Sequence, residues 1–252
     1  MIRGIYAAGS GMIAESIRND AIANNLANAN TAGYKKDIAV NKDFRDILIT
    51  RIHDKSGNAE IGSTGVGTVI DEIATNQSTG IMRQTNNPLD VAIEGKGFFV
   101  IETPNGVRYT RNGSFSRNSQ GELVTLDGYR VMGDNGPIRL GKAANVCIGD
   151  DGRVTIDGNG RNAAEVGKLR IESFADERQL TKEGSSLFIA VQGNGTPSNA
   201  LVHQGMLEMS NVNVVSEMVN MIAGYRAYEV NSKVVQAHDQ LLDKAVNEVG
   251  RI

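Results

Sequence analysis

The chain has 252 residues, 40% of them hydrophobic, with a formal net charge of −3 at pH 7 and a single cysteine. This composition allows one or two domains with a core, excludes an internal disulfide, and shows no basic cluster typical of a nucleic-acid interface. No apolar run is long enough for a membrane span or a secretory signal peptide. If the protein leaves the cytoplasm, we expect it to use another route.

The first predicted element is a helix from Ile2 to about Ala29. Glu15 and Asn19 interrupt its heptad register, and a buried asparagine can fix the register of paired helices at a cost in stability. The alternative is an ordinary amphipathic helix that covers its own domain. The small or apolar residues on this register are Ile5, Ala8, Met12, Ile22, Leu26 and Ala29.

The asparagine-rich stretch 24–36 follows the helix, and its Gly33 suits a position just past a helix end. Asparagine is a poor helix former but a good capping residue. One interpretation of Asn24, Asn25 and Asn28 is a fraying helix end. The other is a set of amides that bond to neighbouring subunits.

Residues 37–52 predict a short amphipathic helix, because Phe44, Ile47, Leu48 and Ile52 share one helical face. From Asp54 to about residue 67 the composition turns to Ser, Gly, Asn and Thr. That composition predicts a loop or linker.

Residues 69–209 predict a β-rich domain inserted between two helices. Turn sequences such as Asp127-Gly128 tolerate positive φ and separate short apolar runs. Cys147 lies in one run, where we expect a small buried hydrophobic side chain. The runs are Leu89–Ile93, Phe98–Ile101, Val107–Thr110, Leu123–Thr125, Tyr129–Met132, Val146–Ile148, Val154–Ile156, Leu169–Phe174 and Leu187–Val191.

The longest predicted helix runs from Val214 to Val249, with Asn213 as its N-cap and Glu217 in its first turn. At about 1.5 Å per residue it is roughly 54 Å long, whereas a small domain is about 30 Å across. It therefore needs a partner, either elsewhere in the chain or in another subunit. The predicted heptad seam is Val214, Met218, Met221, Tyr225, Tyr228, Ser232, Val235, Leu242, Val246 and Val249. A second stripe is Val215, Val219, Ile222, Val230, Val234, Leu241 and Ala245.

The sequence offers no convincing chemistry for catalysis, and we expect no catalytic residue, cofactor or metal. The histidines 53, 203 and 238 lack metal-ligand spacing. Residues 158–163 fit a dinucleotide fingerprint in letters alone, because Asp157-Gly158 is typical of a hairpin turn and the segment that follows is strand-like rather than helical. The aspartates near 150 and 157 are better explained as turns than as a calcium loop.

Two classes of function fit these elements. The first is an assembly subunit whose terminal helices polymerise. The second is a β-rich binding or hydrolytic domain that its helices merely dimerise. Only the first predicts open-ended assembly without turnover of a small molecule.

Short motifs at both ends and in the middle of the chain point to a family. They lie at residues 10–12, 24–28, 31–36, 87–99, 109–115, 210–213, 217–222 and 226–233. These motifs resemble the shared signatures of bacterial flagellar rod and hook proteins. The chain length and short central domain are more similar to a rod protein than to the larger hook protein.

The resemblance implies an α+β fold, in which long N- and C-terminal helices form a coiled-coil-like assembly domain around an inserted β-rich domain. Its expected parts are an N-terminal assembly helix at 1–36, an irregular connector at 37–68, a β-rich outer domain at 69–209 and a C-terminal assembly helix at 210–252. The implied assembly interface comprises Ile5, Met12, Ile22, Asn24, Asn25, Leu26, Asn28, Met218, Met221, Ile222, Tyr225, Tyr228, Val235 and Leu242.

The implied function is structural rather than enzymatic: a subunit of the basal-body rod, the drive shaft that crosses the periplasm and transmits torque from motor to hook in cell motility. A hook or hook-adjacent protein is the alternative. The implied partners are further copies, other flagellar axial proteins and the type III export apparatus, with no nucleic acid and no membrane insertion. Export would need no cleaved signal peptide. Phe44 and Leu48 match an export element of related proteins, or else pack in a core.

Overall fold

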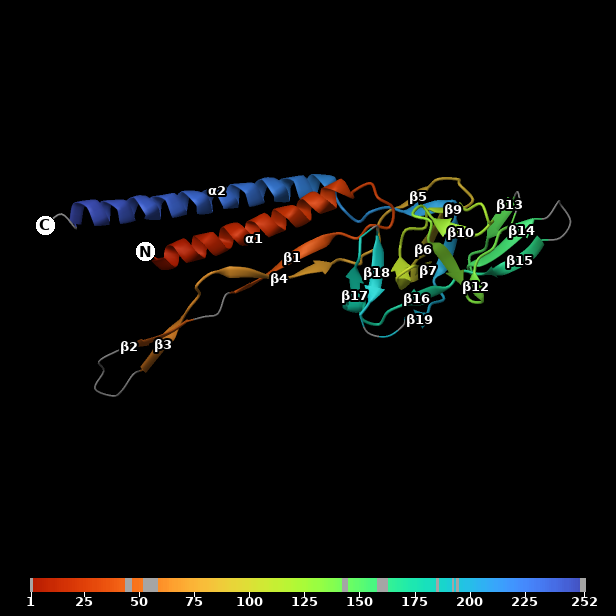
Figure 1. The fold of residues 1–252 in the computed structure, drawn as a ribbon, viewed down its shortest axis with the longest axis horizontal. Coiled ribbons are helices and arrows are strands. Elements are labelled where there is room, and N and C mark those ends of the chain that lie inside the picture. Colours follow the sequence, from red (N-terminus) through yellow and green to blue (C-terminus); the bar gives the residue numbers. More distant parts are fainter. Residues whose placement is uncertain are drawn as a thin grey trace. The chain divides into compact units, whose positions relative to one another are not determined.

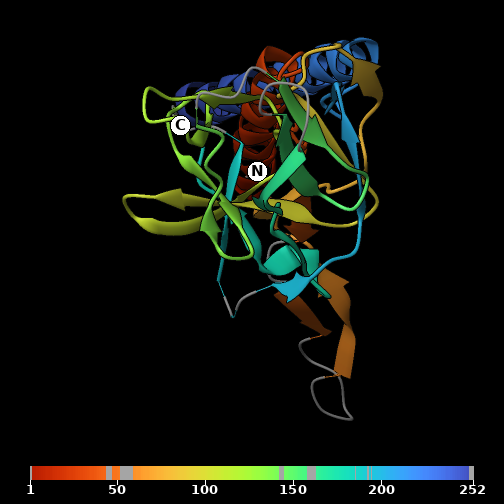
Figure 2. The ribbon, with the colours of Figure 1, turned by 90° about the vertical axis from the view of Figure 1, so that its right-hand side faces the viewer.

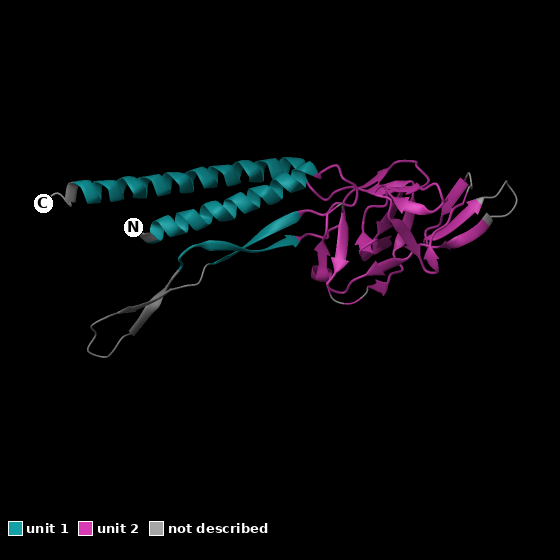
Figure 3. Ribbon diagram, in the orientation of Figure 1, with its two compact units in different colours: residues 1–27, 37–74, 213–252 teal, residues 28–36, 75–212 magenta. Residues whose placement is uncertain are grey.

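The protein, represented by a computed structural model, has an α+β fold with a helix near each end of the chain and a β-rich region between them. The structure describes residues 2–43, 47–51, 59–141, 145–157, 163–184, 186–191, 193 and 195–249. Two compact units divide the chain: unit 1 comprises residues 1–27, 37–74 and 213–252, and unit 2 comprises residues 28–36 and 75–212 (Figure 3). Each unit therefore combines segments that are distant in sequence.

Unit 1 contains two long helices that lie side by side, and the two ends of the chain lie at the same end of the pair (Figure 1). The predicted terminal helices are therefore confirmed. They are accompanied by two antiparallel strand pairs, β1 with β4 and β2 with β3. The bounds are α1 Ile2–Ala27, α2 Val214–Lys244, the π-helical extension η2 Ala245–Val249, β1 Asp37–Asp43, β2 Ile47–Arg51, β3 Ala59–Thr64 and β4 Thr68–Thr75.

Side-chain caps fix one end of each helix. Asn213 is the N-cap of α2, as predicted, and its Oδ1 accepts a hydrogen bond from Ser216 N at 3.1 Å. Near the other end of α1, the buried amide of Asn25 donates to Asp37 O at 2.8 Å and accepts from Asp37 N at 2.8 Å. The Asn213 bond satisfies a backbone N–H that a helix start leaves without a partner, whereas the two Asn25 bonds join α1 to the first residue of β1.

The amphipathic helix predicted over residues 37–52 is wrong, because the described part of this segment forms β1 and β2. The loop predicted beyond residue 54 also contains a strand, β3, which pairs with β2 as a ribbon (Figures 1 and 2). Bulky residues at Ile47, Leu48 and Ile49 favour extended backbone when a partner strand is present. Helical spacing alone did not reveal that partner.

Unit 2 is almost entirely β-structure, and each predicted apolar run contains a strand. Its largest sheet has the order β17-β18-β8-β7-β11-β10-β9, with β12 on β11, and β16 between β7 and β19. The remaining sheets are β13-β14-β15, β20-β6 and β21-β5. The bounds are β5 Met82–Gln84, β6 Val91–Glu94, β7 Phe98–Thr103, β8 Gly106–Thr110, β9 Phe115–Arg117, β10 Leu123–Thr125, β11 Arg130–Gly133, β12 Gly136–Pro137, β13 Asn145–Ile148, β14 Arg153–Asp157, β15 Ala163–Lys168, β16 Ile171–Ser173, the short 3₁₀ helix η1 Glu177–Gln179, β17 Leu180–Lys182, β18 Leu187–Ala190, β19 Thr196–Pro197, β20 Leu201–Gln204 and β21 Met206–Glu208.

Strand β7 lies at the centre of unit 2 and is buried on both faces. Successive side chains of a strand point to opposite sides, so Phe99 and Ile101 enter the larger core. Phe98 and Val100 enter a smaller aromatic core on the other side. One strand therefore contributes side chains to both cores of unit 2, which explains why its apolar residues do not alternate with polar ones.

The prediction that Cys147 is buried is wrong: its thiol is free and exposed. Cys147 lies on β13 between Val146 and Ile148, which are both buried. The alternation of the strand therefore directs the cysteine outward. Within the described ranges, no helix combines the length and the hydropathy that a membrane span requires.

Candidate assembly surface and buried ion cluster

The closest contacts between α1 and α2 are made by glycines and polar side chains. Toward α1, helix α2 presents Glu217, Gly224, Asn231 and His238, spaced seven residues apart. A Cβ atom on Gly224 would lie only 2.4 Å from the Oδ1 atom of Asn19 on α1. The helices therefore approach closely where one of them lacks a side chain.

The large aliphatic side chains of α2 face away from α1. We call Val215, Val219, Ile222, Val230, Val234 and Leu241 the outer stripe, and all six are exposed. Val215 is 71% exposed and Val230 is 60% exposed, although a side chain of this kind gains free energy when it leaves water. The second stripe predicted from the sequence is thus real, and the described chain leaves its aliphatic members uncovered.

The seam predicted for α2 differs from the side of α2 that contacts α1 by one residue at every second position. Met218 and Tyr225 are exposed, whereas their neighbours Glu217 and Gly224 are buried. Hydrophobicity favoured the larger residues, but the close approach to α1 requires small ones. Met221, Val235 and Leu242 belong to both registers and are half-buried, whereas Ile222 and Tyr228 are exposed.

The residues predicted on α1 lie mostly on its more buried side. Ile22 and Asn25 are buried, and Ile5, Met12 and Leu26 are half-buried. Asn24 is exposed and Asn28, which belongs to unit 2, is half-buried. The assignment of these residues to an interface between subunits stays a prediction.

A groove of about 420 Å³ lies on unit 1 beside α1. Tyr6 and Ile13, which line this groove, are exposed apolar side chains. Ser10, which also lines it, accepts a hydrogen bond from Thr68 N at 3.2 Å. The lining residues are Ile5, Tyr6, Gly9, Ser10, Ile13, Val66 and Gly67. Unit 1 therefore has a second apolar surface, distinct from the outer stripe.

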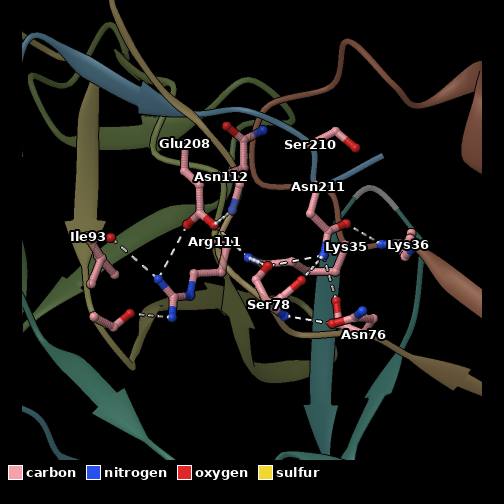
Figure 4. A network of polar contacts seen from close by, with 12 residues as sticks. Lys35, Lys36, Asn76, Ser78, Ile93, Arg111, Asn112, Glu208, Ser210 and Asn211 are labelled. Carbon is pink, nitrogen blue, oxygen red and sulfur yellow. Dashed lines mark hydrogen bonds and ion pairs between the residues drawn. The ribbon is translucent and has the colours of Figure 1, made fainter. Parts of the chain in front are cut away.

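Unit 2 contains a buried ion cluster around the carboxylate of Glu208 (Figure 4). Lys35 Nζ donates to Glu208 Oε1 at 2.5 Å, and Arg111 Nη1 donates to Glu208 Oε2 at 3.3 Å. The side chains of Lys35, Arg111 and Glu208 are 1%, 4% and 0% exposed. We refer to these three residues as the ion cluster.

The cluster holds two cations and one carboxylate, so its charge is not balanced. Backbone carbonyl oxygens also accept hydrogen bonds from the two cations. Lys35 Nζ donates to Ser78 O at 2.8 Å, and Arg111 Nη2 donates to Gly95 O at 2.7 Å. Burial lowers the pKa of Lys35 and that of Arg111, while Glu208 opposes both shifts. Removing Glu208 would leave both cations without a directly bonded carboxylate, with Glu177 as the remaining negative charge that acts on them.

Backbone bonds join the same segments. Lys36 N donates to Asn211 Oδ1 at 2.8 Å, and Asn211 Nδ2 donates to Asn76 O at 2.8 Å (Figure 4). Gly33 N donates to Glu208 O at 2.7 Å. Gly33 has φ +67°, and a Cβ atom there would lie 2.3 Å from Asn112 N, so no other residue fits. Segment 28–36 is therefore an ordered part of unit 2.

Sequence reasoning did not find the ion cluster. Glu208 is 173 residues from Lys35 and 97 from Arg111, and no local pattern relates them. The glycine and polar positions between the helices did leave a signal, since Gly4 and Gly11 on α1 repeat the seven-residue spacing of Gly224, Asn231 and His238.

Catalytic chemistry finds no support in the described part of the chain. There, no group of three His, Cys, Asp or Glu residues is placed to hold a metal ion. His203 contacts Glu94 at 2.6 Å in unit 2, whereas His238 lies against α1 in unit 1. Of the two residues predicted for export, Phe44 lies outside the described residues, and Leu48 is in β2, paired with Ser63.

Family comparisons match the two helical ends and the middle of the chain. The model described as "Flagella basal body rod protein" matches residues 5–35, and "Flagellar hook protein FlgE/F/G D1 domain" matches 92–156. "Flagellar basal body rod FlgEFG protein C-terminal" matches 203–248. The flagellar basal-body rod protein FlgG of Bacillus subtilis is 37% identical over 264 residues, covering 98% of this chain and 99% of that protein. This chain belongs to the flagellar basal-body rod protein family.

Other members of the rod family match as completely. FlgG of Borreliella burgdorferi is 37% identical over 265 residues, covering 98% of each chain. The flagellar hook-basal body complex protein FlhO of Bacillus subtilis is 34% identical over 277 residues, covering 100% of each chain. The rod family is structural, so this protein is not an enzyme.

Replacement of Glu208 by glutamine should destabilise unit 2 strongly. Glu208→Gln removes the carboxylate that is bonded to two buried cations, which costs about 3–5 kcal/mol, whereas Lys35→Met leaves Arg111 paired with Glu208 and should cost less. Hydrogen exchange of the β7 amides measures the difference. Lys96→Met, at a side chain that is 79% exposed, serves as the control. Equal losses in Glu208→Gln and Lys35→Met would contradict the central role of the carboxylate.

The free energy of unfolding should rise with pH in the alkaline range because of Lys35. Burial lowers the pKa of Lys35 in the folded protein below 10.5, so between the two values the unfolded chain binds more protons. Stability therefore increases with pH through this window and is lost as the pH falls through the folded pKa. Urea unfolding at a series of pH values, compared with Lys35→Met, isolates this slope. Identical slopes would show that Lys35 does not contribute.

Proposed function

We propose that this protein is a structural subunit of the flagellar basal-body rod and polymerises through its terminal helices into the shaft that transmits torque from motor to hook. The outer stripe is the observation that carries this proposal. Its residues lie on α2 opposite the side that contacts α1, and all of them are exposed. A stripe of this kind marks a surface that a partner covers.

The energy of assembly follows from the same surface. Burial contributes about 25 cal/mol per Å² of apolar area, so covering a few hundred Å² of helix contributes several kcal/mol per contact. A subunit in a tube makes several such contacts at once, and their effects reinforce one another. A coiled-coil-like bundle of terminal helices from successive subunits fits the heptad spacing of both helices.

Open-ended assembly requires two different surfaces that fit each other, because a self-complementary surface closes into a dimer. Unit 1 offers two: the outer stripe on α2 and the groove lined by Tyr6 and Ile13 beside α1. Further copies of this chain and the other axial proteins of the rod are the proposed partners. A hook-adjacent position is the alternative, which the full-length match to FlhO favours.

Export is the second part of the proposal. A rod subunit works beyond the cytoplasm, and we propose that this one passes through the flagellar type III export apparatus in an unfolded state, without a cleaved signal peptide. Phe44 and Leu48 are the proposed recognition element. The free thiol of Cys147 suits this route, since no disulfide has to be broken before passage.

A charge in the outer stripe should prevent assembly without unfolding the monomer. Ile222 is 55% exposed, so aspartate there is solvated in the free chain but becomes a buried unpaired charge in a contact. Sedimentation over a concentration series should show polymers for the wild-type chain and monomers for Ile222→Asp. Gln120→Asp adds the same charge at an exposed position of unit 2, outside the outer stripe, and is the control. Assembly of Ile222→Asp at wild-type concentrations would remove the outer stripe from the interface.

Replacement of Phe44 by alanine separates an export element from a packing role. An export element predicts that Phe44→Ala accumulates in the cytoplasm while the purified protein keeps wild-type thermal stability. A core position predicts a loss of about 3 kcal/mol or more. Fractionation of cells and thermal unfolding of purified protein give the two readouts. Normal secretion of Phe44→Ala would end the export assignment.

A further inference from the structure

Three contacts between α1 and α2 share one geometry: a polar side chain of one helix lies against a glycine of the other. A Cβ atom on Gly4 would lie 2.5 Å from His238 Nε2, and one on Gly11 would lie 2.9 Å from Asn231 Nδ2. The third contact reverses the roles, because Asn19 on α1 lies against Gly224 on α2. We call these three contacts the polar–glycine steps.

The steps repeat at regular intervals along an antiparallel pair. Position numbers rise on α1 from Gly4 to Gly11 while they fall on α2 from His238 to Asn231, by seven residues in each case. The step at Asn19 and Gly224 follows eight residues later on α1 and seven residues earlier on α2. Seven or eight residues are about two turns of helix, so all three steps lie on one side of each helix.

The steps do not act as good stabilising contacts. Asn19 Oδ1 and His238 Nδ1 are buried and find no hydrogen-bond partner among the described residues. A buried polar atom without a partner costs about 1–3 kcal/mol. Helix α2 has many apolar side chains, but those of the outer stripe are exposed. The seam therefore lacks the stabilisation that burial of these side chains would provide.

We propose that the polar–glycine steps are a register lock, which holds α1 and α2 in one antiparallel register and thereby determines which side chains a second copy of the chain meets. The proposal rests on the proposed assembly through the terminal helices. A polar side chain at a single seam position is a known way to specify register at a cost in stability. Here glycine supplies the complementary space.

A slip of one heptad in either direction breaks the match. In one direction, Asn19 meets Asn231, and two amides compete for space that a glycine provides in the native register. In the other direction, Asn19 meets Glu217, while Gly11 meets Gly224 and leaves a gap. Neither slipped register brings additional apolar side chains into the seam. The mismatched steps therefore raise the free energy of both slipped registers, which is the property of a lock.

Disulfide formation between introduced cysteines measures the register directly. Ala8 and Val235 lie midway between two steps on facing helices, so Ala8→Cys with Val235→Cys reports the native register. Ala8→Cys with Tyr228→Cys and Glu15→Cys with Val235→Cys report the two slips. All three pairs are placed in full-length Cys147→Ser protein. A disulfide needs Cα atoms within about 7 Å, whereas a heptad slip moves them by about 10.5 Å.

In the wild-type seam we expect the native pair to form at least about tenfold more disulfide than either slipped pair. The triple variant Asn19→Ala, Asn231→Ala, His238→Ala should keep its helices paired but form native and slipped disulfides to similar extents. Its control, Ser16→Ala with Gln236→Ala and Gln240→Ala, replaces exposed polar residues on the same helices and should keep the native preference.

A single register in the triple variant overturns the lock, as does a slipped disulfide that forms as readily as the native one in the wild-type seam. If the triple variant loses helix, the single variant Asn231→Ala carries the same test, and an unchanged native preference there also overturns the proposal. Sedimentation of the same proteins keeps the two proposals apart. A locked register in a chain that never polymerises contradicts the proposed function alone, whereas polymers from a chain with several registers contradict only the lock.

Discussion

The carboxylate of Glu208 is the group on which unit 2 depends. It binds Lys35, which follows α1 in the chain, and Arg111, from the middle of the chain, and it lies shortly before α2 begins. A buried charge is stable only when it is paired and hydrogen-bonded, and this carboxylate neutralises part of an otherwise excessive positive charge. The two ends of unit 2, segments 28–36 and 208–211, are therefore fixed to each other by a buried ion pair. Asn211 and Gly33 complete this closure through backbone bonds.

Unit 1 follows a different rule, because glycines and polar side chains make the closest contacts between its helices, whereas the aliphatic residues of the outer stripe stay exposed. Most helix pairs in soluble proteins do the reverse, since burial of apolar area is what holds an amphipathic helix in place. The arrangement makes sense for a subunit of a polymer. In the proposed assembly, the outer stripe contacts neighbouring subunits, and the internal seam aligns the two helices. The two proposed roles are then carried by different faces of α2.

Much of this fold could be predicted from the sequence. Periodicity predicted both helices, the cap at Asn213 was recognisable, and turn chemistry separated the strands of unit 2. The failures have separate physical causes. Strand β2 depends on its pairing with β3, which helical spacing does not reveal. The seam of α2 was placed one residue away, because ranking by hydrophobicity passes over Gly224 and Asn231. Glu208 and Lys35 are joined across 173 residues without a local pattern. Cys147 is different: the flanking Val146 and Ile148 already indicated that it faces outward.

The discontinuity of both units has a consequence for the order in which the chain can fold. Unit 1 needs α2 and unit 2 needs Glu208 and Asn211, so neither is complete until the last fifth of the sequence is present. Contacts between such distant residues form late, because the intervening chain must first be brought together. A chain that leaves a narrow channel with its N-terminus first would therefore hold no finished unit while it is still threaded. Both units would then complete their folding only after the chain has been released from the channel.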